Sequence, residues 1–366
     1  LASILAANNT FTLQGNNVPA EAESELPDRV NSIITFSMLL QHVLRIYLQR
    51  TVDVETNDIS KISDKDLLEI FNTHWLKCRP TSEQVKTFIA LLWQVRYLFD
   101  KHVIKWVSVD DSRVHAIRRL YINRNNTKNT ISLQRQSSDA DPQFALLQSM
   151  LYHSQQMTTQ YWLTPLLSFL LDHGDANANL YLRHLDNHLL CSEVNASLLE
   201  RTHRFLVNPW HREKLLDAKV SLNQTFDNGT QYPHYWFYKL EFVLYIKHFN
   251  DRAVDDFRMT AKNSVEHITP QNPEKESDRI ESALLHNFGN LALVTRSLNS
   301  EMSNKGFSIK KAEFEERHRG QSVSLKLEDI YLNTRWQEAE ITSHQDKMIK
   351  IFNEYLEDIA NQVSLL

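Results

Sequence analysis

The sequence predicts a mostly α-helical protein, in which a helical N-terminal domain precedes a small ββα segment packed with C-terminal helices. The 366 residues are enough for two or three domains with full hydrophobic cores. Only 6 glycines and 9 prolines occur, which is few for the many tight turns of an all-β or dinucleotide-binding chain. Hydrophobic residues make up 42% and charged residues 23%, as is typical of a globular protein.

Apolar residues recur at helical spacing through most of the chain. Residues 1–26 are polar and irregular, and we expect them to form a linker. Residues 27–255 are expected to form the helical domain, in which Ser82 marks one of the helix starts. Residues 256–366 are expected to form the second domain, which ends in a long amphipathic helix from Trp336 to Ile359.

The segment 113–135 departs from helical spacing. Its Asn-rich turn lies between two apolar stretches, which predicts a β-hairpin, with a helix followed by a loop as the alternative. Residues 112–138 include six basic residues and no acidic one. The formal net charge of the chain is −5, so any contact with nucleic acid must use such a local patch. The candidate nucleic-acid contacts in this patch are Arg118, Arg119 and Arg124, the alternative being a solvated basic face.

Residues 264–311 carry the pattern that points to chemistry. The residues up to His267 read as a short strand, Pro270 ends it, and a polar loop with a short helix follows. A second strand comes after Asn290, and a helix begins near Ser297. Phosphodiester hydrolysis needs a base that takes a proton from water and a cation that neutralises the phosphate. A histidine is a base with a near-neutral pKa, and carboxylate and amide oxygens are hard ligands that suit Mg²⁺.

This segment resembles the His-Asn-His nucleases, also called His-Me finger or ββα-metal nucleases. The residues that carry the resemblance are Glu266-His267-Ile268-Thr269-Pro270, Asn290-Leu291, Asn299 and Lys305. The resemblance implies that His267 is the general base and that Asn290 orients its ring. It also implies that Glu266 and Asn299 bind Mg²⁺ or Mn²⁺. The nucleic-acid contacts expected in this region are Lys305, Arg296, Lys310 and Lys311.

Two features depart from the family pattern. Glu266 stands where Asp is usual, and its extra methylene leaves open whether it binds the metal directly or through a water. The Cys-x-x-Cys pairs of zinc-stapled members are absent, because the chain has only Cys78 and Cys191. We therefore expect no structural zinc, and the low cysteine content indicates a reducing, cytoplasmic setting.

The sequence is most similar to the C-terminal region of GmrSD-type, modification-dependent restriction proteins. Two upstream passages, Trp93–Lys101 and His234–Glu241, also follow that family, so the resemblance spans roughly 27–360, although only 264–311 is specific. It implies a Mg²⁺-dependent DNA endonuclease module of an anti-phage restriction system. Such proteins usually carry a ParB-like nucleotide-hydrolysing domain with an Asp-Gly-Gln-Gln-Arg signature, which this sequence lacks. That partner is expected upstream of this chain or on a second polypeptide.

Two alternatives stay open at this stage. The chain could be a catalytically silent module that reads DNA modification or docks a partner, and Glu266 in place of Asp favours this reading. RNA is also compatible as a substrate, because the metal chemistry is the same.

His184 and His188 are four residues apart but lack the Glu of a metalloprotease motif, so we expect them to be structural. No apolar run reaches the roughly 18–20 residues of a membrane helix, so no membrane contact is expected.

Overall fold

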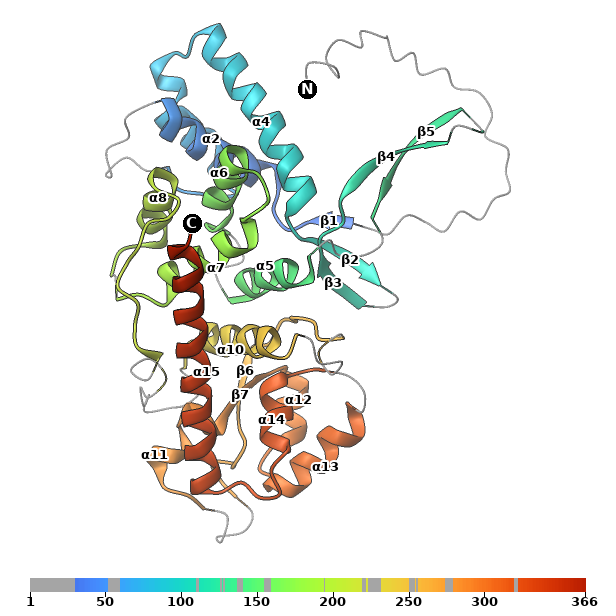
Figure 1. The fold of residues 1–366 in the computed structure, drawn as a ribbon, viewed down its shortest axis with the longest axis vertical. Coiled ribbons are helices and arrows are strands. Elements are labelled where there is room, and N and C mark those ends of the chain that lie inside the picture. The colour runs from blue at the N-terminus through green and yellow to red at the C-terminus, as the bar shows by residue number, and fades with distance from the viewer. Residues whose placement is uncertain are drawn as a thin grey trace.

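A computed structural model describes residues 30–51, 60–109, 112–125, 127, 129–136, 141–154, 159–193, 195–218, 222, 232–249, 254, 256–273, 279–318 and 322–366. The expected linker, residues 1–26, lies outside the described residues. Figure 1 shows an elongated molecule with a larger helical part above and a smaller mixed part below. The helices dominate both parts, which confirms the predicted fold class.

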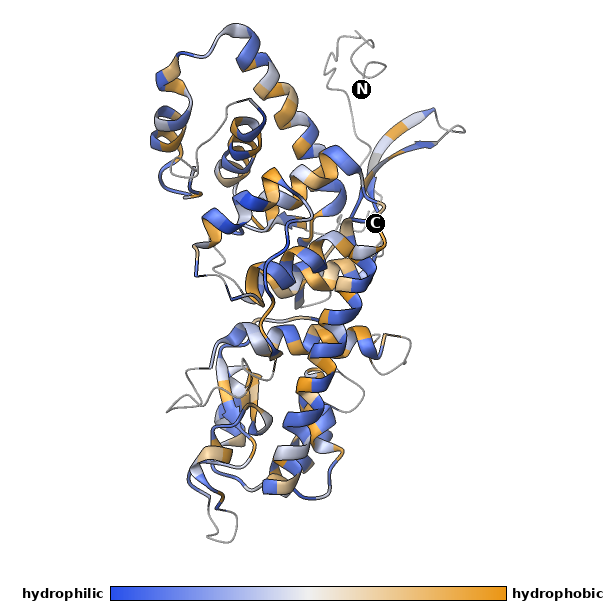
Figure 2. Ribbon diagram, turned by 60° about the vertical axis from the view of Figure 1, so that its left-hand side comes forward, coloured by the Kyte–Doolittle hydropathy of each residue, from blue (hydrophilic) through white to orange (hydrophobic). Residues whose placement is uncertain are grey.

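The upper part is built from helices whose apolar faces meet in one core. These helices are α2 (Phe36–Thr51), α3 (Leu67–His74), α4 (Ser82–His102), α5 (Pro142–Ser154), α6 (Leu163–His173), α7 (Ala178–Leu190) and α8 (Leu198–Val207). Figure 2 shows hydrophobic and hydrophilic residues on different sides of many of them. Helix α4 begins where the sequence predicts, because Thr81 and Gln84 form a reciprocal capping box. None of the described helices combines the length and the apolar character that a bilayer-spanning segment requires.

Two small antiparallel sheets flank these helices. Strands β1 (Val30–Ser32), β2 (Lys105–Val109) and β3 (Ser112–Ala116) form one sheet, and β4 (Leu120–Asn125) pairs with β5 (Thr130–Arg135) in the other. The second pair is the predicted hairpin, and it projects from the upper part as a two-stranded ribbon (Figure 1). Strand β3, which the sequence grouped with this hairpin, belongs to the first sheet instead.

The lower part has the predicted order of strand, loop, strand and helix. Its elements are β6 (Ser264–His267), α11 (Ser282–Leu285), the 3-10 turn η6 (Phe288–Asn290), β7 (Leu291–Val294), α12 (Arg296–Met302), α13 (Phe307–Arg317) and α14 (Leu325–Tyr331). Strands β6 and β7 pair antiparallel, and α12 packs against β6. A separate small core lies among these elements and includes Ile268, Val294 and Leu298.

Two helices join the upper and lower parts. Helix α10 (His234–Lys247) contacts α5 above and both α14 and β7 below. Helix α15 (Glu338–Ser364) runs along the molecule from the lower part to the upper part and contacts both η6 and α7 (Figure 1). The large hydrophobic core is therefore continuous across the expected boundary between residues 255 and 256. The helical part supports the ββα segment as one packed unit.

Candidate active site

The site is built on the β6–β7 hairpin. Glu266 lies opposite Ala292 and His267 lies opposite Leu291 in the antiparallel ladder. The ladder continues one step further, because the Ile268 amide donates to the Asn290 carbonyl at 2.9 Å. Adjacent residues of a strand point to opposite faces, so Glu266 and His267 serve different surroundings.

Asn290 fixes the loop that follows His267. Its Oδ1 accepts from the Thr269 amide at 2.9 Å and from the Trp336 indole at 3.1 Å. Its Nδ2 donates to the carbonyls of Leu285, at 2.9 Å, and Thr269. The side chain is fully buried. These bonds hold the backbone beside His267, and this differs from the expectation that Asn290 acts on the ring itself.

Gly289 is required by a close backbone approach. A Cβ atom at this position would lie 2.6 Å from the Ile341 carbonyl oxygen of α15. Since a backbone atom cannot move aside as a flexible side chain can, only glycine lets η6 sit against α15. The Gly-Asn pair that begins the second half of the motif thus anchors the hairpin to the long C-terminal helix.

His267 is buried and neutral at physiological pH. Its Nε2 lies 3.1 Å from Nδ1 of His286 and 3.4 Å from Nε2 of Gln271. Burial lowers the pKa of His267 to about 4, with smaller contributions from His286 and Lys310. A neutral imidazole keeps one nitrogen lone pair, which a general base needs. His286 lies 19 residues further along the chain. No local spacing linked it to the site, and only the hairpin fold brings it there.

Glu266 and Lys310 form a buried ion pair on the opposite face of β6. Nζ of Lys310 lies 2.5 Å from Oε1 of Glu266 and donates to the His267 carbonyl at 2.7 Å. Lys310 is fully buried, and burial raises the pKa of Glu266. The sequence predicted that Lys310 is a surface residue that contacts nucleic acid, and this prediction differs from its buried position. Its ammonium instead fixes the end of β6.

Asn299 lies on α12, where its backbone carbonyl accepts from the Ser303 amide at 3.0 Å. Oδ1 of Asn299 is buried and has no hydrogen-bond partner among the described residues. Asn299 does not cap the helix, because the N-cap is Thr295, whose hydroxyl accepts from the Leu298 amide. An orphaned amide oxygen suits Mg²⁺, which needs few protein ligands and keeps several waters. Within the described ranges, no group of three or more His, Cys, Asp and Glu side chains could hold a metal.

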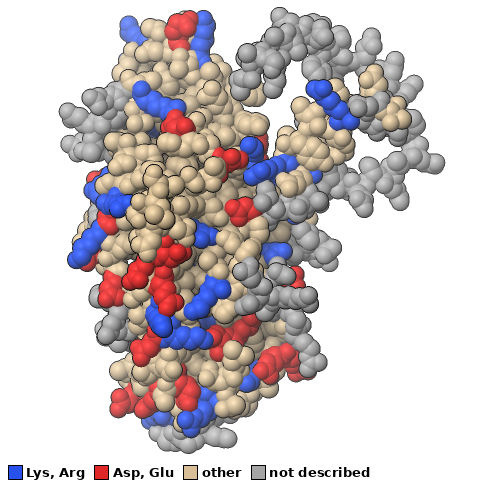
Figure 3. Space-filling model, in the orientation of Figure 1, with Lys and Arg blue, Asp and Glu red and all other residues tan. Residues whose placement is uncertain are grey.

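The other basic residues named from the sequence are scattered. Lys305 pairs with Glu313 at 2.7 Å, Lys311 donates to the Asn333 carbonyl at 2.9 Å, and Arg296 is exposed. Figure 3 shows basic and acidic side chains interspersed over the lower half of one face, with no broad basic surface there. On this face, the lower part therefore offers separate basic groups to an anionic ligand.

Arg118, Arg119 and Arg124 lie at the base and within the β4–β5 ribbon. Arg124 is exposed, whereas Arg118 and Arg119 are half-buried. Figure 1 places this ribbon beside the upper part, far from β6 and β7. These arginines and the hairpin site are thus two separate regions of the surface.

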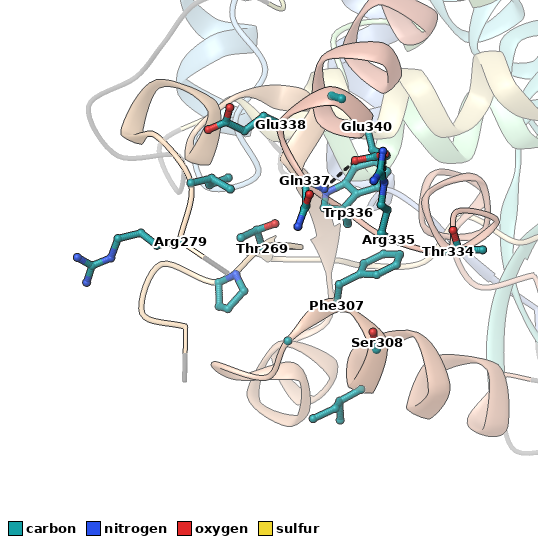
Figure 4. Close-up of a pocket in the computed structure, with 15 residues that line it drawn as sticks. Thr269, Arg279, Phe307, Ser308, Thr334, Arg335, Trp336, Gln337, Glu338 and Glu340 are labelled. Carbon is teal, nitrogen blue, oxygen red and sulfur yellow. Dashed lines mark hydrogen bonds and ion pairs between the residues drawn. The ribbon is translucent and has the colours of Figure 1, made fainter. Parts of the chain in front are cut away.

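A cavity of about 660 Å³ lies next to the loop after His267. Its walls come from three regions that are far apart in the sequence, namely 269–270 with 279–280, 306–309 and 334–340. Figure 4 shows Thr269, Trp336, Arg335 and Phe307 around this hollow. Trp336 joins the cavity to the site, because its indole donates to Asn290. No sequence motif pointed to this cavity.

The comparisons with known proteins concern the same region. Residues 221–351 match the family model of GmrSD restriction endonucleases, C-terminal domain. This match confirms the predicted resemblance for this part of the chain, which includes α10, the hairpin site and the first half of α15. No curated protein and no solved structure matches the chain.

Proposed function

We propose that the β6–β7 hairpin and α12 form a His-Me finger site that hydrolyses phosphodiester bonds of DNA with a bound Mg²⁺ or Mn²⁺. The protein would then be the endonuclease module of a restriction system, as the name of the matching family suggests. One observation carries the proposal. A buried, neutral His267 ends β6, and α12, which packs against that strand, carries the Asn299 side-chain oxygen, which has no hydrogen-bond partner in the described part of the chain.

His267 is the general base in this proposal. Its ring nitrogen takes a proton from a water molecule as the water oxygen forms a bond to phosphorus, and the bond from phosphorus to the 3′ oxygen breaks. A pKa of about 4 keeps the base unprotonated at neutral pH. A bound cation supplies charge neutralisation for the phosphate and for the leaving oxygen.

The metal ligands are divided unequally in this proposal. The side-chain oxygen of Asn299 has no hydrogen-bond partner among the described residues, so it would be the direct protein ligand of the cation. Glu266 is held by Lys310, so its carboxylate acts from outside the ligand shell of the cation through water. A water-mediated carboxylate also agrees with the presence of Glu where Asp is usual in the family.

Three further residues position the base without touching the phosphate. Lys310 binds the His267 carbonyl, Asn290 binds the loop amide of Thr269, and His286 contacts the ring nitrogen of His267. Together they hold both the backbone and the ring of His267. Such fixed placement is what lets a single histidine act as an efficient base.

Cleavage of supercoiled plasmid by the full chain tests this function. Wild-type protein is expected to nick plasmid with Mg²⁺ or Mn²⁺ and to stop in EDTA. His267→Ala should abolish nicking while its thermal unfolding matches the wild type. His318→Ala is the matched control, because His318 ends α13 in the same part of the molecule but outside the site. Metal-dependent nicking by His267→Ala at the wild-type rate would sink the assignment.

The competing function is a silent module that binds DNA or a partner without cutting. The buried Glu266–Lys310 pair favours it, because that carboxylate is already neutralised by a side chain. The two functions differ in one observation, which is metal-dependent cleavage with and without a ParB-like, nucleotide-hydrolysing partner. A chain that binds DNA yet never cuts, even with that partner and Mn²⁺, is the silent module.

A further inference from the structure

The cavity beside the active site contains a helix start that lacks a side-chain cap. Helix α13 begins after Gly306, which has no side chain to accept hydrogen bonds from the first-turn amides. Gly306, Phe307 and Ser308 all line the cavity. Amide groups at a helix start and the helix dipole favour an anion such as phosphate.

A second, independent feature of the cavity points to a ligand. Thr269 lines the cavity and is only 4% exposed, yet its hydroxyl has no hydrogen-bond partner among the described residues. An unsatisfied buried hydroxyl destabilises the folded protein, because it has lost its hydrogen bonds to water without replacing them. Figure 4 shows this hydroxyl on the side of Thr269 that faces Gln337. A ligand oxygen in the cavity would relieve that cost.

The charges around the cavity suit one phosphodiester. Arg335 is exposed at the wall, where its Nε donates to Glu340 at 2.7 Å. Glu340 also accepts from the Gln337 amide, so this carboxylate is largely neutralised. Glu338 is the other acidic residue of the wall. Arg279 also lines the cavity, and in Figure 4 it lies on the same side of the cavity as Glu338. A single negative charge is therefore tolerated better than a triphosphate.

We propose that this cavity binds a backbone phosphate of the nucleic acid, next to the phosphate that is cut. The Ile309 amide already donates to the Gly306 carbonyl, so the amides of Phe307 and Ser308, together with the hydroxyls of Ser308 and Thr269, would bind its oxygens. Thr269 is two residues from His267, so their Cα atoms are at most about 7 Å apart. A phosphate bound by Thr269 would therefore lie close enough to the phosphate at His267 for both to belong to one nucleic-acid strand. The inference rests on the proposed function, because that function supplies the nucleic acid.

Equilibrium binding of a short duplex DNA in EDTA tests the phosphate site without cleavage. Ser308→Asp places a carboxylate in the first turn of α13, which favours the helix but repels phosphate. We expect affinity to fall about tenfold and the slope of log affinity against log salt to shrink by about 0.9, the loss of one phosphate contact. Thr269→Val, which removes the hydroxyl at nearly constant shape, should weaken binding in the same direction.

Thr342→Asp is the matched control, because it adds the same charge to an exposed position of α15 outside the cavity. It should bind DNA as the wild type does. Thermal unfolding of each variant separates lost binding from lost folding. Wild-type affinity and salt slope in Ser308→Asp would overturn the inference, and so would a wild-type chain that fails to bind DNA.

Inorganic phosphate and ATP distinguish the source of the phosphate group. If either binds the wild type and Ser308→Asp abolishes that binding while DNA affinity is unchanged, the cavity serves a free nucleotide or phosphate and the inference is overturned. Cleavage assays separate this result from the proposed function. If the wild type cuts DNA and Ser308→Asp binds DNA with wild-type affinity, only the phosphate site is contradicted. A wild type that binds DNA through Ser308 but never cuts contradicts only the nuclease.

Discussion

The upper and lower parts of the molecule contain two clusters with nearly the same ingredients. On α7, Asp186 pairs with Lys239, and both side chains are fully buried. On β6, Glu266 pairs with Lys310 in the same way. Each carboxylate has a histidine close by in the sequence, and burial lowers the pKa of His184 and of His267 to about 4.

Both clusters contain buried side-chain atoms without a hydrogen-bond partner among the described residues, and in the upper cluster one of these is Nε of Arg201, whose guanidinium also pairs with Glu213. His184 Nε2 lies 2.9 Å from the His211 carbonyl, and the Glu213 amide donates to His188 at 2.9 Å. In the lower cluster, the side-chain oxygens of Asn299 and Thr269 have no hydrogen-bond partner among the described residues. Burial and lowered histidine pKa values are thus shared by both clusters, and the lower cluster differs because the unpartnered hydroxyl of Thr269 lies in the wall of a cavity.

The two lysines give the largest expected effect on stability. Lys239→Met and Lys310→Met each leave a buried carboxylate unpaired, and each should lower the free energy of unfolding by about 3–5 kcal/mol. Urea denaturation measures this change. A loss below about 1 kcal/mol for either variant would show that its carboxylate is hydrated or protonated without cost, and the parallel between the clusters would break.

Acid should weaken the upper cluster in a defined pH window. Burial lowers the pKa of His184 and His188 from 6.5 to about 4, so the unfolded chain binds protons more readily than the folded one. Their contribution to stability is complete above pH 6.5 and is lost as the pH falls toward 4. The slope should be up to about 1.4 kcal/mol per pH unit for each histidine.

Urea denaturation between pH 7.5 and pH 4.5 measures that slope. His188→Leu removes one of the two groups, so the slope between pH 6.5 and pH 4 should become shallower than in the wild type. An unchanged slope in this variant would mean that His188 does not titrate with folding.

Substitution of two asparagines, one in each cluster, should give the smallest changes in the free energy of unfolding, and the two changes should differ in direction. Asn187 of α7 is buried and accepts from Lys239 at 2.8 Å, whereas Asn299 of α12 has an unused oxygen. Asn187→Leu should lower the free energy of unfolding by about 1–3 kcal/mol, because it leaves an ammonium hydrogen unpaired. Asn299→Leu should leave it unchanged or raise it by up to about 1 kcal/mol, as expected where function is kept at the expense of stability.

Thermal and urea unfolding of the two asparagine variants, together with plasmid nicking, make this comparison. Asn299→Leu is expected to lose nicking despite its stability. A stability loss in Asn299→Leu as large as that in Asn187→Leu would mean that Asn299 is a packing residue.

The sequence predicted the local features of the site and missed those that depend on packing. The strand, loop, strand and helix order and the position of His267 follow from short-range patterns, as does the β4–β5 hairpin. The partners of Glu266 and of His267 do not, because Lys310 and His286 reach β6 only after the chain has folded back. The positive charge of Lys310 led to the prediction that it is exposed. In the structure its ammonium is buried against Glu266 and the His267 carbonyl at the end of β6.

The cavity was invisible to sequence reasoning for the same physical reason. Its walls come from a loop, a helix start and the beginning of α15, and these three regions are far apart in the sequence. Gly289 and Trp336 position that wall against the hairpin through tertiary contacts alone. Local spacing can propose a base and a metal ligand, but the surface that receives the substrate comes from the whole fold.

The most direct test of this account compares the same substitution in both clusters. Single-turnover cleavage of plasmid with Mg²⁺ is measured for His267→Gln and His184→Gln, with each rate divided by the folded fraction. We predict that His267→Gln falls by about 10²–10⁴-fold and that His184→Gln stays within about twofold of the wild type. Equal rates in the two variants, whether both fall or both stay, would contradict the claim that only His267 takes part in the chemistry.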